Sequence, residues 1–235
     1  MKRLHTKSQN FLRSPKLVYT LIGHSNIKKS DTVYDIGAGS GIIAGALAKR
    51  CKQVVAIEHD ARLIATLQGN LGRYDNVTIL RDDVLHYHFP ATPYKIFANI
   101  PFHLSSPVVR KLTESEHPPR AIYLIVQKQF AQKLLMDTSS FTGSIGALIT
   151  PLFTTRIRYK LQRSDFTPPP AVDTVLIELK LRAEPLLDPD RMSAYREFVE
   201  LCFARQKYFT GLGQTKRPSE LTSEEWVELF RKVAS

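Results

Sequence analysis

Short runs of apolar residues alternate with helical patterns over the first half of the chain. The run 32–36 ends in a glycine-rich turn at 37–41, and apolar positions then recur at helical spacing over 42–50. Further runs predict strands at 54–57, 77–80, 94–98 and 121–126, with another helix at 61–71. Strands that alternate with helices predict an α/β fold with a doubly wound, mostly parallel sheet.

The pattern changes after residue 150. Two alternating runs, 156–161 and 175–181, flank a proline-rich turn at 166–170 and predict an antiparallel pair at the edge of the sheet. From residue 188 onward, apolar stripes at helical spacing predict a small helical domain. They consist of Tyr195, Phe198, Val199, Cys202 and Phe203, and of Trp226, Leu229 and Phe230. We expect one domain over 1–182 and a helical C-terminal domain over 183–235.

The charge is placed unevenly. The 235 residues carry a formal net charge of +11. Residues 1–30 hold seven lysines and arginines and no acidic residue, whereas 31–102 hold seven residues of each sign. A basic N-terminal arm over 1–30 favours a polyanionic partner such as RNA. The side chains of Arg110, Lys111, Lys128, Arg156, Arg158 and Lys160 are further candidates for phosphate contacts.

Several classes of protein are disfavoured. The longest unbroken apolar run, 121–126, is far shorter than the roughly 20 residues of a membrane helix. Cys51 and Cys202 fit no metal or redox spacing, and the seven histidines form no convincing ligand set. We expect a reduced, cytoplasmic, monomeric protein with no metal and no membrane partner.

The first strand and its turn predict a nucleoside site. Gly37 and Gly39 allow backbone amides to approach a ligand closely. Glu58 ends the second strand, where a carboxylate can accept hydrogen bonds from ribose hydroxyls. Asp83, after the third strand, can accept from the exocyclic amine of an adenine. A dinucleotide fingerprint expects a third glycine where Ile42 stands, which disfavours NAD and FAD. A plain turn and solvated carboxylates stay open as alternatives.

The tetrapeptide Asn99-Ile100-Pro101-Phe102 follows the fourth strand. It resembles the signature of S-adenosylmethionine-dependent enzymes that methylate exocyclic amines of bases. Such an amine is a poor nucleophile, so a site must hold it close to the methyl donor. An Asn side-chain oxygen and a backbone carbonyl beside Pro101 can accept its two N–H groups and stabilise the developing positive charge. Phe102 can stack on an extruded base.

Taken together, the motifs from about residue 5 to 182 resemble the rRNA adenine N6-methyltransferase superfamily, which has a Rossmann-like class I methyltransferase sheet. The matching elements are 8–12, 35–41, Glu58, Asp83, 99–102, 126–131 and 166–173. The resemblance implies S-adenosyl-L-methionine as the cofactor. It assigns cofactor binding to Gln9, Asn10, Leu12, Gly37, Gly39, Glu58, Asp83 and Asn99. It assigns catalysis to Asn99 and Pro101 on the amine, with Phe102 and Phe166 on either side of the target base.

The superfamily has two main branches. The Erm branch methylates one adenine of 23S rRNA and confers macrolide, lincosamide and streptogramin B resistance, whereas the KsgA-like branch dimethylates two adjacent adenines of 16S rRNA. Ser8, Ile100 and the 127–131 element look more like Erm, but Pro169-Pro170 and Asp173 look more like the other branch. We favour the Erm branch. Mono- and dimethylation both stay open.

Two functions of other classes compete with catalysis. A methyltransferase fold can be reused as a non-catalytic RNA-binding protein or transcription factor. The intact set of Gly37, Glu58, Asp83 and 99–102 weighs against that reuse. A nicotinamide oxidoreductase would leave the Asn-Ile-Pro-Phe element unexplained.

Overall fold

The computed structural model describes residues 10–136 and 143–234, in two compact units. The first unit is formed by residues up to 128 together with 157–179, and the second by 129–156 and 180–235. The second unit therefore contains a central segment of the chain as well as the C-terminal one. The domain division between residues 182 and 183 stays a prediction.

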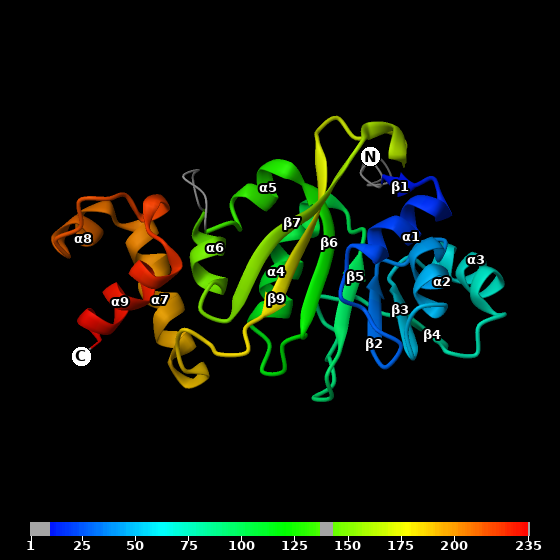
Figure 1. Ribbon diagram of the computed structural model, residues 1–235, viewed down its shortest axis with the longest axis horizontal. Coiled ribbons are helices and arrows are strands. Elements are labelled where there is room, and N and C mark those ends of the chain that lie inside the picture. Colours follow the sequence, from blue (N-terminus) through cyan, green and yellow to red (C-terminus); the bar gives the residue numbers. More distant parts are fainter. Residues whose placement is uncertain (1–9, 137–142, 235) are drawn as a thin grey trace, which may run out of the picture. The chain divides into compact units, whose positions relative to one another are not determined.

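A seven-stranded mixed sheet runs through the described chain in the order β4-β3-β2-β5-β6-β9-β7 (Figure 1). Its strands are β2 Thr32–Ile36, β3 Gln53–Glu58, β4 Val77–Arg81, β5 Lys95–Ala98, β6 Ala121–Gln127, β7 Phe153–Leu161 and β9 Thr174–Leu181. The pairs β2–β3, β3–β4, β2–β5 and β5–β6 are parallel. Strand order reverses between β2 and β5, which is where open α/β sheets form a binding crevice.

β9 and β7 form the predicted antiparallel edge. The Arg182 N–H donates to the Leu152 carbonyl at 2.8 Å, and the Thr154 hydroxyl donates to the Lys180 carbonyl at 3.4 Å. Residue numbers rise along one strand as they fall along the other, which is the antiparallel relation. The α/β fold class expected from the sequence is confirmed, including the edge pair and the helical C-terminal region.

Helices cover both faces of the sheet in the first unit (Figure 1). α1 (Pro15–Gly23), α2 (Ile42–Ala48) and α3 (Ala61–Leu71) lie on one face and α4 (Ser105–Thr113) on the other. The apolar pattern did not predict α1, although its sequence carries start signals. Ser14 caps it by accepting from the Leu17 N–H, and Pro15 occupies its first turn. Val18, Leu21 and Ile22 are buried in the core.

A second, two-stranded sheet ties the N-terminal segment to the turn between β7 and β9. β1 (Phe11–Leu12) pairs antiparallel with β8 (Phe166–Thr167). Leu12 is 6% exposed and Phe166 is fully buried. The described 3₁₀ turns are η1 Phe102–Leu104, η2 Arg163–Asp165, η3 Pro189–Arg191 and η4 Pro218–Glu220.

The second unit is mainly helical. Its helices are α5 Lys128–Gln132, which starts at the boundary, α6 Ser144–Ile149, α7 Met192–Ala204, α8 Gln206–Gly211 and α9 Ser223–Val233. The ring of Trp226 is fully buried and lies 5.7–6.2 Å, centroid to centroid, from the rings of Phe203, Phe209 and Phe198. The Tyr195 hydroxyl donates to the Ala147 carbonyl at 3.0 Å, which joins α7 to α6.

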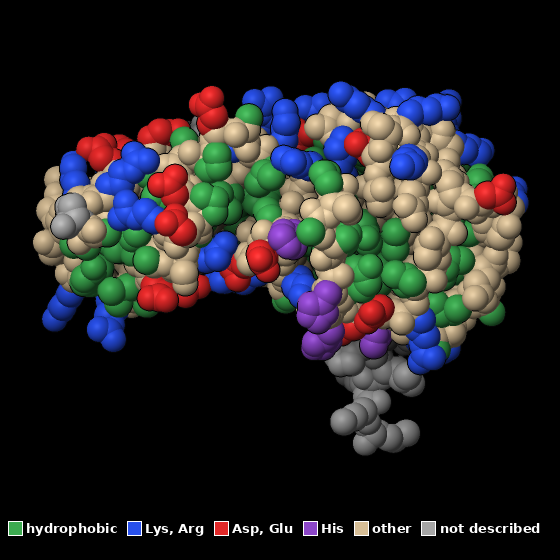
Figure 2. All heavy atoms as spheres, turned by 90° about the horizontal axis from the view of Figure 1, so that it is seen from below, with side chains coloured by type: hydrophobic (Ala, Val, Ile, Leu, Met, Phe, Trp, Pro, Cys, Tyr) green, Lys and Arg blue, Asp and Glu red, His purple; other side chains and the backbone are tan. Residues whose placement is uncertain are grey.

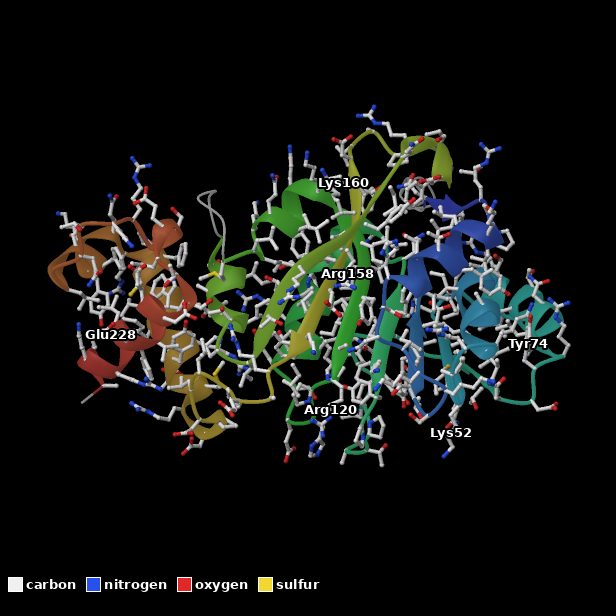
Figure 3. The ribbon with its side chains drawn as sticks, in the orientation of Figure 1. Lys52, Tyr74, Arg120, Arg158, Lys160 and Glu228 are labelled. Carbon is white, nitrogen blue, oxygen red and sulfur yellow. The ribbon has the colours of Figure 1, made fainter. Side chains whose placement is uncertain are left out.

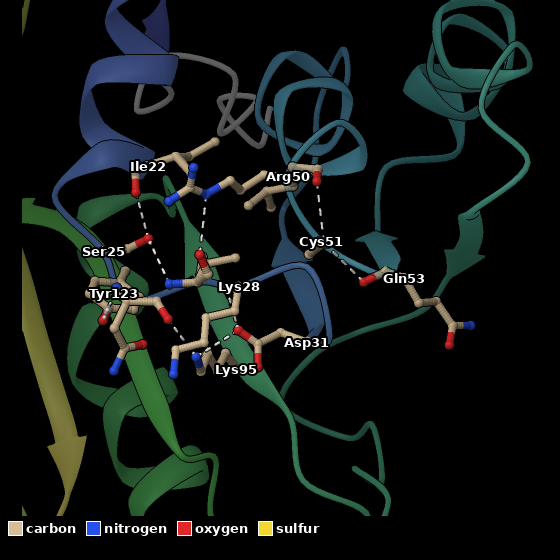
Figure 4. Close-up of polar contacts among 12 residues, drawn as sticks. Ile22, Ser25, Lys28, Asp31, Arg50, Cys51, Gln53, Lys95 and Tyr123 are labelled. Atoms are coloured by element: carbon tan, nitrogen blue, oxygen red, sulfur yellow. Dashed lines mark hydrogen bonds and ion pairs between the residues drawn. The ribbon is translucent and has the colours of Figure 1, made fainter.

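A polar network anchors the loop that follows α1 to the sheet (Figure 4). The Tyr123 hydroxyl accepts from the Asn26 N–H at 2.9 Å and donates to Glu178 at 2.6 Å. Lys95 donates to the Asn26 carbonyl at 2.8 Å and forms an ion pair with Asp31 at 2.7 Å. Because the backbone groups of Asn26 are paired in this network, the loop after α1 is held against β5, β6 and β9.

Replacing Tyr123 by Phe removes the shared hydroxyl. We expect the free energy of unfolding to fall by about 1–3 kcal/mol, because the buried Glu178 carboxylate loses a donor and the part-buried Asn26 N–H loses its acceptor. Urea unfolding measures the change. Tyr159→Phe is the matched control, since that ring is only half-buried. An unchanged urea midpoint for Tyr123→Phe would contradict the proposed importance of the network.

Candidate functional site

A cavity of about 700 Å³ lies at the carboxyl ends of β2, β3, β4 and β5. Its volume is in the usual range of small-molecule sites. Four connections supply most of the wall, at residues 36–40, 57–62, 82–85 and 99–104, and Asn10, Phe11 and Leu12 add to it. The cavity therefore lies at the switch point of the sheet, within the first unit.

The glycine-rich turn keeps the wall after β2 open. Gly39 has φ +57°, which disfavours a side chain, and a Cβ atom there would lie 3.5 Å from the ring of Phe11. Gly41 has φ +88°, and its Cβ atom would lie 2.9 Å from Leu67. Gly39 thus leaves room beside the cavity, and Gly41 allows α2 to approach α3.

Glu58 holds two walls of the cavity together. Its carboxylate is 5% exposed and accepts from the Gly39 N–H at 2.8 Å and from the Asp60 N–H at 2.7 Å. A carboxylate has about four lone-pair sites, so two oxygens with one bond each can still accept from hydroxyl groups of a ligand. Glu58 lines the cavity.

Asp83 stands in the wall after β4. One carboxylate oxygen accepts from the Leu85 N–H at 3.0 Å, and the other lies 3.2 Å from Nδ1 of His86. These contacts fix the side chain in the loop with unused lone pairs, as an acceptor for an amine requires.

Asp60 is the N-cap of α3, and the Arg62 guanidinium holds the pKa of its carboxyl at about 2.

Asn99 is oriented by the N-terminal segment. Its Nδ2 donates to the carbonyl of Asn10 at 2.8 Å. Because a carbonyl can only accept, the amide nitrogen must point to Asn10, and Oδ1 is left as the acceptor. A fixed acceptor of this kind suits an incoming amine.

Pro101 and Phe102 continue the same wall. The Pro101 carbonyl accepts from the Leu104 N–H at 2.9 Å and retains a second lone pair. Phe102 begins η1, is half-buried and lines the cavity. The structure thus brings Asn99, Pro101 and Phe102 together with Asn10 and Leu12.

Two residues of the sequence-based set lie elsewhere. Gln9 falls outside the described residues. Phe166 is fully buried, packs in the core and does not line the cavity. Stacking of Phe166 on a base would require its exposure, and that role stays a prediction. The predicted cavity residues that line the wall are Asn10, Leu12, Gly37, Gly39, Glu58, Asp83, Asn99, Pro101 and Phe102.

Phe11 and His103 also line the cavity, although the sequence motifs assigned no role to them. Phe11 is 43% exposed. Its place between two assigned residues of one motif is the signal in the sequence that could have identified it. His103 follows Phe102 directly and is exposed.

Asp35 is a buried acid beneath the glycine-rich turn. It is 1% exposed, and neither oxygen has a hydrogen-bond partner of normal geometry among the described residues. Burial raises the pKa of this carboxyl well above its usual value, the Ala44 backbone N–H opposes the shift, and the charge of Glu58 adds to it. The protonated form is therefore favoured relative to an exposed aspartate.

The described residues form neither a metal-binding cluster nor a membrane-spanning helix. No group of three or more His, Cys, Asp and Glu residues in this part of the chain could hold a metal ion. No helix among 10–136 and 143–234 is long and apolar enough to cross a membrane.

Known proteins resemble the chain along its whole length. The rRNA adenine N-6-methyltransferase of Lysinibacillus sphaericus is 32% identical over 242 residues, covering 98% of this chain and 97% of that protein. The ribosomal RNA small subunit methyltransferase A of Bacillus licheniformis is 30% identical over 209 residues, which cover 85% of this chain and 72% of that protein. The crystal structure of the 23S rRNA methyltransferase ErmE superposes with a TM-score of 0.81 and 26% identity. The superposition covers 96% of this chain and 100% of that chain.

The family profile described as "Ribosomal RNA adenine dimethylase" matches residues 2–215. That match includes the glycine-rich turn, the Asn-Ile-Pro-Phe element and every other wall of the cavity. The chain is an rRNA adenine N6-methyltransferase and belongs to the ribosomal RNA adenine dimethylase family.

Proposed function

We propose that this chain methylates N6 of a single adenine in 23S rRNA, in the cytoplasm, and that its expression confers macrolide, lincosamide and streptogramin B resistance. The observation that carries the choice of branch is the set of Erm-like motif residues, Ser8, Ile100 and the 127–131 element. The 32% identity to the Lysinibacillus sphaericus rRNA adenine N-6-methyltransferase over 98% of this chain supports it, as does the 26% identity to ErmE.

The cavity fits the cofactor of the family, S-adenosylmethionine. The glycine-rich turn leaves room for a close backbone approach, and Glu58 and Asp83 keep unused acceptor sites for hydroxyl and amine groups. We assign the ribose to Glu58 and the adenine to Asp83, with Asn10, Leu12, Gly37 and Gly39 along the rest of the cofactor. When bound, S-adenosylmethionine supplies an electrophilic methyl group.

The chain's own residues prepare the target amine. Asn99 Oδ1 and the carbonyl beside Pro101 accept its two N–H groups, which draws the nitrogen lone pair out of conjugation and stabilises the positive charge that develops. The contact between Asn99 and Asn10 keeps that oxygen in place before the base enters. With S-adenosylmethionine bound, these residues would present the N6 lone pair to its methyl group, and the proton that N6 must lose would pass to water.

The small-subunit reaction is the second candidate. It is favoured by Pro169-Pro170 and Asp173 and by the relatives named as small subunit methyltransferases. The same site chemistry would apply to both, because both modify N6 of adenine. The RNA that takes label distinguishes them.

The first experiment supplies the purified protein and labelled S-adenosylmethionine to protein-free 23S rRNA and, separately, to immature small ribosomal subunits. We expect label in 23S rRNA at one adenine, located by mass spectrometry. Label confined to small subunits would replace the 23S proposal by the small-subunit one. Absence of label from both, with S-adenosylhomocysteine still bound, would favour a non-catalytic RNA-binding role.

Asn99→Ala should lower kcat by about 100-fold or more, because it removes an acceptor that acts in the transition state. Calorimetry with S-adenosylhomocysteine should show cofactor affinity within a few-fold of the wild type. Ser106→Ala, at an exposed position of α4, is the control and should keep full activity. A wild-type rate for Asn99→Ala would remove Asn99 from the catalytic residues.

Phe102→Ala should raise the KM for RNA at least about fivefold, since a stacking ring contributes roughly 1–3 kcal/mol per base. Phe102→Tyr keeps the ring and should retain most of the activity. Steady-state kinetics with varied RNA measures both variants. Equal KM values for Phe102→Ala and the wild type would exclude stacking by this residue.

A further inference from the structure

Three segments of the first unit are rich in Lys and Arg and contain no acidic residue. Residues 13–30 hold four such cations, 42–53 hold three and 157–163 hold three. They are Arg13, Lys16, Lys28, Lys29, Lys49, Arg50, Lys52, Arg158, Lys160 and Arg163. The segments are far apart in the sequence and correspond to α1 with its following loop, α2 with its C-terminal end, and the last part of β7 up to the first residue of η2.

Direct contacts bring these segments side by side. The Arg158 guanidinium donates to the His24 carbonyl at 2.9 Å, and that of Arg50 donates to the Ile27 carbonyl at 3.2 Å. Lys49 Nζ lies 5.6 Å from the ring centroid of Tyr19 on α1. The three segments therefore form one surface, which we name the α1 face.

The figures show the charge of this face. Lys and Arg side chains gather along the upper edge of the first unit in Figure 2, which is the side facing the viewer in Figure 1. In Figure 3, Arg158 and Lys160 lie along β7, whereas Lys52 and Arg120 lie before the first residues of β3 and β6, at the end of the sheet opposite the cavity. Lys16, Lys28, Lys49 and Lys160 are all exposed.

Three acidic groups near the α1 face lie beside cations. Asp31 is paired with Lys95, Glu178 lies 3.7 Å from Arg158, and Asp173 lies 3.9 Å from Arg163. Asp165 of η2 accepts from the Gln162 N–H. By contrast, the loop after β4 presents Asp82 and Asp83 at the cavity. A polyanion is therefore attracted to one side of the cavity and repelled from the other.

The α1 face begins at the cavity. Asn10 and Leu12 line the wall, and α1 starts at Pro15 with Lys16 in its first turn. A helix of nine residues is about 13 Å long, which is enough to face several phosphates. Nucleotides next to a base held at Phe102 could thus continue directly onto this face.

Tyr19 adds a feature beyond charge. Its side chain is 44% exposed in the middle of α1, beside Lys49. An exposed aromatic ring among cations is the usual arrangement for stacking on nucleic-acid bases, since every base has a π-face.

We infer that the α1 face binds the phosphate backbone of the RNA next to the target adenine, with Tyr19 stacking on a base or ribose of that RNA. This inference rests on the proposed function, because it requires an RNA substrate at the cavity. The RNA would leave the cavity along this face. Phosphate contacts position the RNA, while the residues of the cavity act on the adenine.

The test compares two double variants with the same change in charge. Lys16→Glu with Lys49→Glu alters the α1 face, and Arg120→Glu with Lys207→Glu alters exposed cations outside it. RNA affinity is measured from low to physiological salt with the rRNA that accepts label from the wild type, or with a 23S transcript if neither does. The α1-face pair should weaken binding at least about tenfold and lower the salt slope by about two. The other pair should stay within about threefold of the wild type.

Kinetics and Tyr19 variants separate this role from a structural one. The α1-face pair should raise the KM for RNA while kcat at saturating RNA and S-adenosylhomocysteine affinity stay unchanged. Tyr19→Ala should weaken RNA binding at least about fivefold, and Tyr19→Phe should restore it.

Equal loss of affinity in both double variants, or none in the α1-face pair, would overturn the inference. If the wild type methylates rRNA in that case, the proposed function survives. If the wild type labels no rRNA, the proposed function fails, whatever the variants show in binding.

Discussion

The buried carboxylate of Glu58 is the contact on which the cavity depends. β2 and β3 are parallel neighbours, so the loops that follow them leave the sheet at the same edge. Glu58 accepts one backbone N–H from each of these loops, at Gly39 and at Asp60. Both bonds are charge-assisted, which makes them stronger than neutral ones, and the bond from the Gly39 N–H is also buried. The glycine-rich turn and the start of α3 are therefore held at a fixed spacing on either side of Glu58.

A second contact between segments distant in the chain positions Asn99 in the loop after β5. Asn99 is oriented by the carbonyl of Asn10, and the segment that carries Asn10 is held by the pairing of Phe11–Leu12 with Phe166–Thr167. The N-terminal segment thus joins the loop after β5 to the turn between β7 and β9. Phe166 takes part in this arrangement as a buried core residue, and Leu12 packs in the same core. The position of Asn99 Oδ1 in the cavity wall is consequently set by residues from both ends of the first unit.

One side of α1 packs in the core, and its other side forms part of the α1 face. Its buried side chains pack on the sheet, and the Tyr123, Glu178 and Lys95 network fixes the loop behind it. Its other side carries Lys16 and Tyr19 beside Lys49, at the edge of the cavity. The packing that stabilises the fold therefore also determines where the positive charge of the N-terminal segment is displayed.

The sequence by itself determined the strands of the seven-stranded sheet, α2, α3 and the residues at the carboxyl ends of those strands, because these depend on local periodicity and on turn residues such as Gly37 and Gly39. It also singled out Asn99 to Phe102, because they form a short contiguous motif. Only the tertiary structure decided the burial of Phe166, the orientation of Asn99 and the exposure of Phe11, because each depends on a contact between segments distant in the chain. The same reason applies to α1 and to the surface it forms with Arg50 and Arg158: charge can be counted along a sequence, but which charges share a face is decided by packing.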